Sequence, residues 1–214
     1  MSTTRVRRSP RARYGPWSNG MLMTPEEFDE SDDFDENYSY ELIHEVLIVS
    51  PPPGESERGP NDELGRLLLN RREGHPEGRM LDATLPEQTI ACGAWNRRRA
   101  DRVVWIGLGR LPEIGKDVPA IAIEFVSQRR RDRVRDYEEK RREYALAGVQ
   151  EYWIIDRFQR TMTVARQARP EPIVLIIKEN EVYTTPLLPG FELPLARLLK
   201  LADDWARRAK KKGQ

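Results

Sequence analysis

The sequence predicts one α/β domain in which a mixed central sheet is flanked by helices. Apolar runs of strand length, such as residues 118–126 and 151–156, recur between segments with apolar residues at helical spacing. The chain has 214 residues and 38% hydrophobic content. Because single domains commonly hold about 150 residues, this length suits one core with polar tails. We therefore expect a basic, disordered leader over residues 1–23, one domain over 24–200, and a basic helical tail over 201–214.

In the N-terminal half, the sequence predicts a helix over residues 25–32, a strand over 40–50, a helix over 61–72, and strands over 79–84 and 87–92. Thr24 is a typical N-cap for the first helix, which has a proline in its first turn. The first strand ends at Pro51, because three successive prolines cannot continue a ladder. Leucines at helical spacing define the second helix, and Pro86 separates the two short strands.

In the C-terminal half, the expected elements are a loop over residues 96–99, strands over 101–106 and 118–126, a helix over 132–147, strands over 151–156, 161–166 and 173–177, and a helix over 195–212. Glycines and a proline between residues 107 and 115 indicate a loop before the apolar strand. Gly148 is a typical stop for the long helix.

Glu124 is the one acid in the apolar run 118–126. An ionised carboxylate in a buried strand is costly unless something pairs with it, so this acid indicates either a functional site or a structural ion pair, with Arg102 or an arginine of the following loop. Successive strand side chains point to opposite faces, which places Glu124 beside the small residue Ala122 and Val126.

A second acid and a lysine complete the candidate site. Asp101 opens the preceding strand, and Lys140 lies four residues from both Asp136 and Tyr144 on the expected helix. If this stripe faces the sheet, the Lys140 ammonium reaches Glu124; if it faces solvent, Lys140 forms an ordinary surface pair. Two acids on strands and a lysine on a helix are the layout of a metal-dependent phosphodiesterase site.

The net charge is only +1, but the charges are segregated along the chain. A leader with five arginines precedes an acidic stretch, residues 26–36. Two arginine clusters flank the candidate site and are candidate phosphate contacts, with a solvated surface as the alternative. Their members are Arg97, Arg98, Arg99, Arg129, Arg130 and Arg131.

The single cysteine, Cys92, excludes an intramolecular disulfide and fits a reducing compartment. No apolar stretch approaches the ~18 residues of a membrane helix, and no apolar signal core follows the basic N-terminus. These observations favour a cytoplasmic location and predict no membrane partner.

Six motifs between residues 40 and 199 occur in the order found in one known family: Tyr40-Glu-Leu-Ile43 before the prolines, Ala100-Asp101, Glu124-Phe-Val-Ser127, Asp136-Tyr-Glu-Glu-Lys140, Ala147-Gly-Val149 with Glu151-Tyr-Trp153, and Pro186-Leu-Leu-Pro-Gly-Phe191. By these motifs the sequence resembles the Uma-two-type restriction endonucleases of the PD-(D/E)XK nuclease superfamily. The lysine helix followed by Gly-Val-x-Glu-Tyr-Trp is the most specific part. Ala100 stands where the family has proline.

The resemblance implies a restriction-endonuclease-like core and a metal-dependent endonuclease that hydrolyses DNA phosphodiester bonds. It implies Asp101, Glu124 and the main-chain carbonyl of Val126 as metal ligands, and Lys140 as the charge-stabilising lysine. Mg²⁺ or Mn²⁺ suits such oxygen ligands. Glu41 is an additional site candidate on the same grounds. A homodimer would bring two sites to the two DNA strands.

Two other classes of function stay open. A catalytically degenerate nuclease fold would bind nucleic acid through the arginine clusters without cutting it. An interaction protein would use the acidic stretch to bind a basic partner or to cover its own basic groove.

Overall fold

The computed structural model describes residues 13–127, 135–168 and 171–212. In this part of the chain, eight strands form one sheet in the order β2-β1-β4-β5-β6-β7-β8, with β3 paired to β4. Their bounds are β1 Ser39–Ile43, β2 Val46–Ser50, β3 Leu81–Cys92, β4 Asn96–Ile106, β5 Ile121–Phe125, β6 Glu151–Asp156, β7 Thr161–Arg166 and β8 Ile173–Lys178. The β5–β6 pair is parallel and the others are antiparallel, so the predicted mixed sheet is confirmed.

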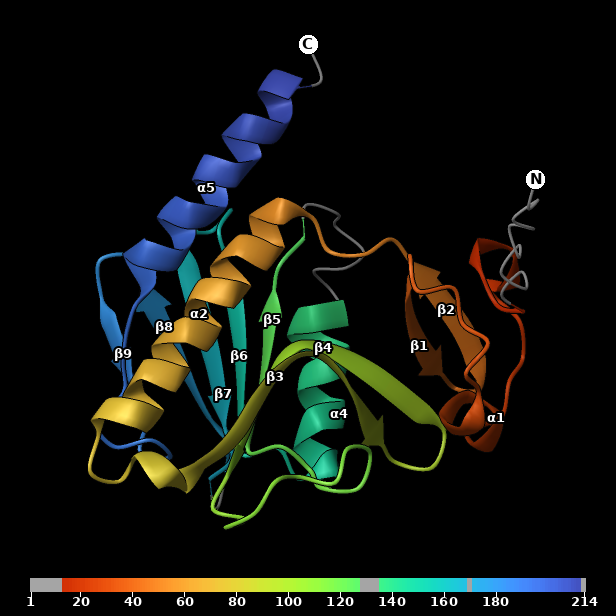
Figure 1. Ribbon diagram of the computed structural model, residues 1–214, viewed down its shortest axis with the longest axis horizontal. Helices are drawn as coiled ribbons and strands as arrows, with labels where there is room; N and C mark the ends of the chain where they lie inside the picture. The colour runs from red at the N-terminus through yellow and green to blue at the C-terminus, as the bar shows by residue number, and fades with distance from the viewer. Residues whose placement is uncertain (1–12, 128–134, 169–170, 213–214) are drawn as a thin grey trace, which may run out of the picture.

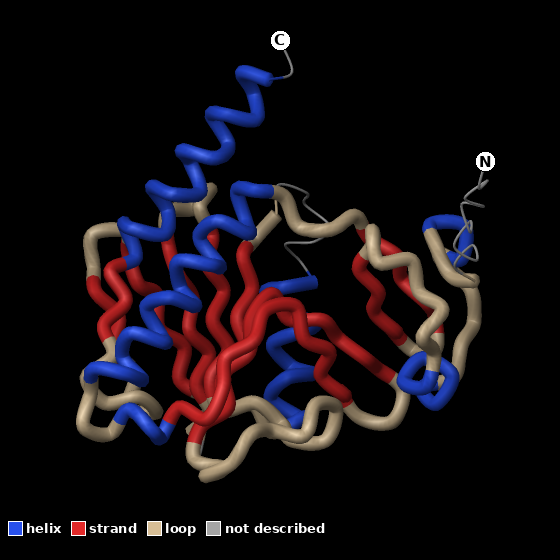
Figure 2. The backbone as a smooth tube through the Cα atoms, viewed as in Figure 1, coloured by secondary structure: helices blue, strands red, loops and turns tan. Residues whose placement is uncertain are grey.

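Helices cover both faces of the sheet (Figures 1 and 2). The long helices α2 (Glu55–Gly74) and α5 (Leu195–Lys212) lie side by side on one face, and α4 (Lys140–Ala147) lies on the other. The shorter elements are η1 Pro16–Ser18, α1 Pro25–Glu30, η2 Gly78–Met80, the π-helical turn η3 Arg135–Glu139, and the small β9–β10 pair, Val182–Thr184 with Glu192–Pro194.

Strand β5 separates two hydrophobic cores, as the period of two predicts. Ile121 and Ile123 belong to the core under α2 and α5. Ala122 and Val126 belong to the core under α4, with Tyr144 from that helix. Glu124 is therefore on the strand face that α4 covers.

The segment expected as one strand over residues 40–50 is a hairpin, which corrects the prediction. Strands β1 and β2 pair antiparallel from Ser39↔Ser50 to Ile43↔Val46. The two residues of the turn, His44 and Glu45, both have positive φ, 49° and 62°. Two-residue hairpin turns favour glycine and asparagine at such positions, so this turn carries no sequence signal.

Two further boundaries differ from the predictions in the same region. Pro86 lies inside β3 rather than between two strands. Among the described residues β3 pairs only with β4, and an edge strand tolerates a residue without an N–H. Residues 96–99 form the start of β4 rather than a loop, because they pair with residues 89–92 of β3. Tertiary pairing overrides the low strand propensity of these polar residues.

The expected leader also ends earlier than residue 23. Tyr14 and Met23 are buried in a small third core with Phe28, Leu42 and Leu47. The backbone of Leu47 bonds to Met21 and Gly20 at 2.8 and 2.7 Å. Residues 13–23 therefore pack against the β1–β2 hairpin, and only residues 1–12 of the leader lie outside the described residues.

The Glu-Tyr-Trp motif at the start of β6 has a structural role. Glu151 is fully buried and accepts hydrogen bonds from the Nε atom of Arg166 at 2.6 Å and Oγ1 of Thr185 at 3.0 Å. It also accepts from Nε1 of Trp153 at 2.8 Å and the hydroxyl of Tyr183 at 2.9 Å. This carboxylate ties β6 to β7 and β9.

We predict that Glu151→Ala destabilises the protein by about 3–5 kcal/mol, because it leaves the arginine of a buried pair without its carboxylate. Urea unfolding would measure the loss. The matched control is Glu113→Ala, which removes an exposed carboxylate from its pair with Lys116 and should cost less than about 1 kcal/mol. Equal losses in the two variants would contradict the structural role.

Candidate active site

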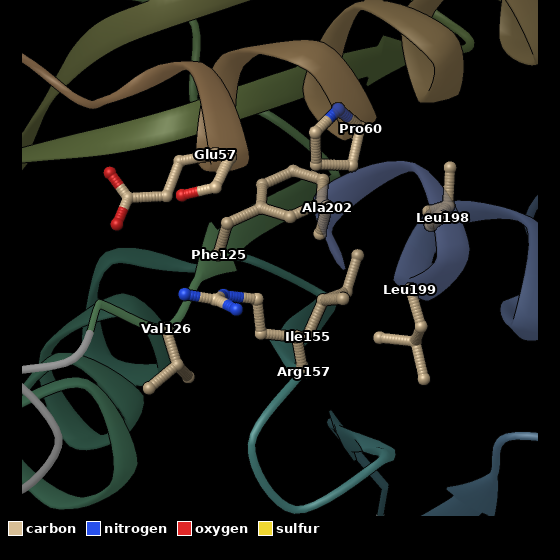
Figure 3. Close-up of a pocket in the computed structure, with 10 residues that line it drawn as sticks. Glu57, Pro60, Phe125, Val126, Ile155, Arg157, Leu198, Leu199 and Ala202 are labelled. Atoms are coloured by element: carbon tan, nitrogen blue, oxygen red, sulfur yellow. The ribbon is translucent and has the colours of Figure 1, made fainter. Parts of the chain in front are cut away.

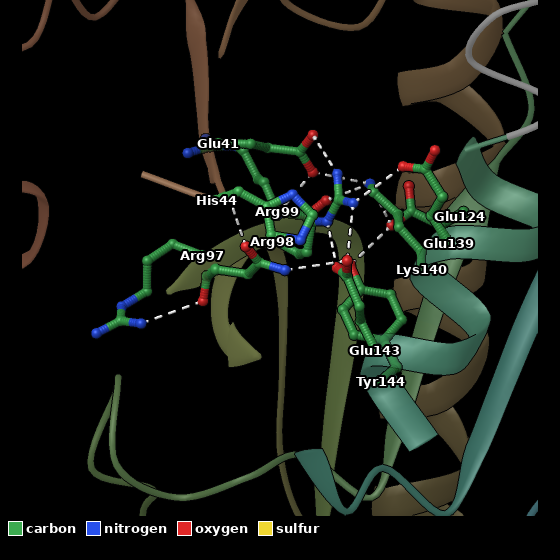
Figure 4. A network of polar contacts seen from close by, with 11 residues as sticks. Glu41, His44, Arg97, Arg98, Arg99, Glu124, Glu139, Lys140, Glu143 and Tyr144 are labelled. Atoms are coloured by element: carbon green, nitrogen blue, oxygen red, sulfur yellow. Dashed lines mark hydrogen bonds and ion pairs between the residues drawn. The ribbon is translucent and has the colours of Figure 1, made fainter. Parts of the chain in front are cut away.

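Glu124 is bound from the helix side (Figure 4). Its side chain is buried at 4% exposure, and its Oε1 accepts hydrogen bonds from Nζ of Lys140 at 2.8 Å and the hydroxyl of Tyr144 at 3.1 Å. The stripe that carries Lys140 and Tyr144 therefore faces the sheet. Arg102, the ion-pair partner considered for Glu124, instead donates to Oδ1 of Asn61 at 2.6 Å and Oγ1 of Thr84 at 3.1 Å.

Lys140 joins three strands to its own helix. The residue is 2% exposed, and its Nζ lies 3.1 Å from Oε1 of Glu41 on β1. Nζ also donates to the carbonyl of Arg99 on β4 at 2.8 Å. The same Glu41 oxygen accepts from the backbone N–H of Arg99 at 3.0 Å. A buried ammonium is stable only with such charged and polar partners, so these contacts fix the position of the Lys140 side chain.

Asp101 reaches the site from β4. Its Oδ2 accepts a hydrogen bond from the backbone N–H of Phe125 at 2.6 Å, so it lies beside the residue that follows Glu124. Its own carbonyl accepts from Nδ2 of Asn61 on α2 at 2.8 Å. Asp101 is half-buried. The sheet thus brings Asp101 and Glu124 to the same end of β5.

Val126 lies just beyond β5, and its backbone N–H donates to the carbonyl of Ile155 at 2.9 Å. It lines a small pocket between the ends of β5 and β6 and helices α2 and α5 (Figure 3). Glu57 and Arg157 bring opposite charges to this pocket, whose floor is apolar. Neither residue has a sequence signal for a site, since Glu57 precedes the helix expected from residue 61 and Arg157 follows the strand expected over 151–156.

Arg98 is a correction to the predicted phosphate contacts. It is fully buried, and its guanidinium forks onto Glu143 through Nε at 2.5 Å and Nη2 at 3.1 Å. Nη2 also donates to Glu139 at 3.1 Å, and Nη1 lies 3.8 Å from Oε2 of Glu41. The described structure gives Arg98 no route to a phosphate, because its charge is enclosed by carboxylates.

The other arginines of the clusters are differently placed. Arg97 binds Asp29 of α1 through three hydrogen bonds of 2.7–2.9 Å, and Arg99 pairs with Glu87 at 2.8 Å. Arg99 also lines a hollow of about 450 Å³ with aromatic and acidic residues of the 28–40 segment. Arg129, Arg130 and Arg131 lie outside the described residues.

Burial and charge set the protonation of the groups around the site. Burial, followed by the charge of Glu124, raises the pKa of Tyr144 well above its usual value, so its hydroxyl stays a donor. Burial alone would lower the pKa of Arg98, but the hydrogen bond to Glu143 and the charge of Glu41 raise it overall. Burial and then the charge of Glu143 raise the pKa of Cys92 to about 12, which makes this thiol unreactive.

The described residues contain no group of three or more His, Cys, Asp or Glu side chains arranged to hold a metal ion. The candidate donors for a cation are the carboxylates of Asp101 and Glu124 and the carbonyl of Val126. Hard oxygen donors of this kind are the type that Mg²⁺ and Mn²⁺ prefer. By the chemistry of its donors, the set is therefore compatible with a hard divalent cation.

A mixed sheet with helices on both faces, acids on adjacent strands and a lysine on the covering helix defines a restriction-endonuclease-like fold. Among solved structures, the chain is similar to the crystal structure of a "putative nuclease belonging to DUF820" from Anabaena variabilis, with a TM-score of 0.64 and 18% sequence identity. The match covers 84% of this chain and 99% of that chain. At this identity the likeness establishes the fold.

The chain belongs to the Uma2 family, described as "Putative restriction endonuclease", whose model matches residues 25–196. The expected family is therefore confirmed. A comparison with curated proteins found no match. None of the helices in the described ranges has the length and apolar character needed to cross a membrane.

We predict that Tyr144→Phe destabilises the protein by about 1–3 kcal/mol, because it removes a hydrogen-bond donor from a buried carboxylate. The control is Tyr38→Phe, at a residue that is only partly buried. Thermal unfolding of both variants would measure the difference. A Tyr144→Phe protein as stable as the wild type would show that the hydroxyl bond does not hold Glu124.

Proposed function

We propose that this protein is a metal-dependent endonuclease that hydrolyses DNA phosphodiester bonds. The observation that carries the proposal is the buried ammonium of Lys140, bound to Glu124 and Glu41 at the end of the sheet that Asp101 also reaches. A solvent-facing lysine would have had no such role. Membership of the Uma2 family supports the same reaction class.

Each residue has a distinct task in the proposal. Asp101, Glu124 and the Val126 carbonyl would hold a divalent cation, Mg²⁺ or Mn²⁺. When bound, such an ion lowers the pKa of a coordinated water and offsets the charge of the phosphate. Lys140 supplies fixed positive charge, which offsets through space the negative charge that develops on the phosphate; its three N–H donors stay with Glu124, Glu41 and the Arg99 carbonyl. Water then adds to phosphorus and loses a proton to solvent as the bond to one ester oxygen breaks, and that oxygen takes up a proton from solvent and leaves as a hydroxyl.

The hydrogen-bond pattern keeps Lys140 ready for this task. Its Nζ is held by acceptors on β1, β4 and β5, so its position is set before DNA binds. A charge fixed in a low-dielectric site stabilises a transition state more than a mobile one in water, because no reorganisation is needed. Glu41 contributes by sharing Lys140 with Glu124, and we assign it an orienting role.

We predict that Asp101→Ala and Lys140→Met each lower the rate of supercoiled-plasmid nicking by about 100-fold or more, the scale of removing one fixed charge-stabilising group. Assays in Mg²⁺, Mn²⁺ and EDTA would test the metal requirement, and EDTA should abolish nicking. The matched control, Lys116→Met, changes an exposed lysine and should cut at the wild-type rate.

Circular dichroism of every variant separates lost chemistry from lost folding. Nicking that persists in EDTA, or that survives in both site variants, would contradict the proposal. A folded wild type that binds DNA and does not cut it would instead support the catalytically degenerate alternative.

One observation favours a second role for the acidic stretch, that of covering the protein's own basic surface. The carboxylate of Asp29 occupies the Nε–Nη2 edge of the Arg97 guanidinium, an edge that a phosphate could bind in the same way. Fork-to-carboxylate and fork-to-phosphate pairing use the same geometry, so the two are mutually exclusive. In this account α1 competes with DNA for Arg97.

We predict that Asp29→Ala strengthens binding of a labelled DNA duplex and steepens the slope of log K against log salt by about one, as expected for one added phosphate contact. Fluorescence anisotropy in Ca²⁺, at several salt concentrations, would measure this slope. Glu30→Ala removes an equal charge from an exposed neighbour and serves as the control. Identical slopes in the two variants would dismiss the covering role.

A further inference from the structure

We propose that Arg98 is the positioning residue of the site: it fixes the rotation of α4 and thereby aims Lys140 at Glu124. The inference rests on the proposed function for its catalytic consequence. The claim that Arg98 determines the position of Lys140 depends only on the contacts of Arg98 and not on the proposed activity. Arg98 is fully buried, and its hydrogen bonds and ion pairs among the described residues go to Glu139, Glu143 and Glu41, not to a candidate metal ligand. It therefore acts through other residues.

Helix α4 presents two neighbouring stripes to the sheet. Lys140 and Tyr144 form one stripe and bind the β5 carboxylate. The adjacent stripe binds Arg98 and consists of Glu143 and of Glu139, which is the last residue of η3, directly before α4. Residues four apart lie on one helix face, and each residue step turns the helix by about 100°. Contacts that fix one stripe against the sheet therefore determine the direction in which the other stripe points.

The Arg98–Glu143 hydrogen bonds matter because of the way in which α4 begins. The helix follows the π-helical turn η3 (Arg135–Glu139), in which hydrogen bonds span five residues rather than four. The register of Lys140, the first residue of α4, is thus not dictated by a regular helix before it. The fork of Arg98 onto Glu143 supplies a fixed reference one turn later.

Further hydrogen bonds connect the Arg98–Glu143 pair to the sheet. Arg98 is part of β4, and Nδ2 of Asn96, on the same strand, donates to Oε1 of Glu143 at 3.0 Å. Oδ1 of Asn96 accepts from the backbone of His44 at 2.7 Å, which ties in the β1–β2 turn. Nη1 of Arg98 also lies 3.8 Å from Oε2 of Glu41, whose other carboxylate oxygen binds Lys140. Arg98 therefore contacts one carboxylate that binds the lysine, Glu41, and one on the neighbouring helix stripe, Glu143.

The test compares Arg98→Met and Arg98→Lys with Arg166→Met. Arg166 is the matched control because it too pairs with a buried carboxylate, Glu151, on a different part of the sheet. The first readout is acetylation of Lys140, measured by peptide mass spectrometry against the exposed Lys116 in the same molecule. This readout needs no catalytic activity.

In folded Arg98→Met, we expect Lys140 to be acetylated faster than in the wild type, and in Arg166→Met we expect it to stay protected. The second readout is the plasmid-nicking rate. For Arg98→Met we expect kcat to fall by about 100-fold, the scale of a misplaced catalytic group, with KM nearly unchanged because Arg98 does not touch DNA. Arg98→Lys keeps the charge without the fork and should recover part of both effects.

Slow acetylation of Lys140 together with wild-type kcat in Arg98→Met would overturn the proposal. Equal effects of Arg166→Met, at equal loss of stability, would also overturn it and leave Arg98 a purely structural role. If the wild type does not cut DNA, the proposed function fails, and the acetylation result alone decides the placement of Lys140. If Arg98→Met does not fold, Glu143→Gln removes the charge of the same fork and is judged by the same two readouts.

Discussion

The ion pair between Lys140 and Glu124 is the interaction on which the rest of the site depends. Both side chains are almost completely buried, and a charge removed from water is tolerated only when others compensate it. The ammonium therefore needs Glu41 from β1 and the Arg99 carbonyl from β4 as well. One lysine thus holds the hairpin, the long strand β4 and helix α4 in a single arrangement around the end of β5.

The fold separates this site from the groups that give the sheet its stability. The Glu-Tyr-Trp motif of β6 forms a closed hydrogen-bond network around Glu151, on the side of β7 and β9. The site instead uses β1, β4 and β5 with α4. Lys140 and Glu151 come from neighbouring motifs but bind different parts of the fold: the lysine contacts the candidate site residues, and the glutamate joins β6 to β7 and β9.

The sequence predicted those parts of the site that follow from local periodicity. A period of two placed Glu124 beside Ala122 and Val126, and a spacing of four placed Lys140 and Tyr144 on one helix stripe. The carboxylates around Arg98 could not be predicted in this way, because they come from distant segments. The pairing of β1 with β4 brings Glu41 to Arg98, and the packing of α4 on the sheet brings Glu143. Three successive arginines looked like a solvated loop, since polarity indicates exposure unless a buried partner is known. The turn at His44 was missed for a similar reason, because its positive φ has no sequence signature.

The most direct test of the central claim is anomalous diffraction from crystals of the protein grown with Mn²⁺. The account predicts one strong peak within coordination distance of Asp101, Glu124 and the Val126 carbonyl, with Lys140 still bound to Glu124. A peak elsewhere, or none at Mn²⁺ concentrations that saturate any measured binding, would contradict the assignment of this cluster as a metal-dependent nuclease site.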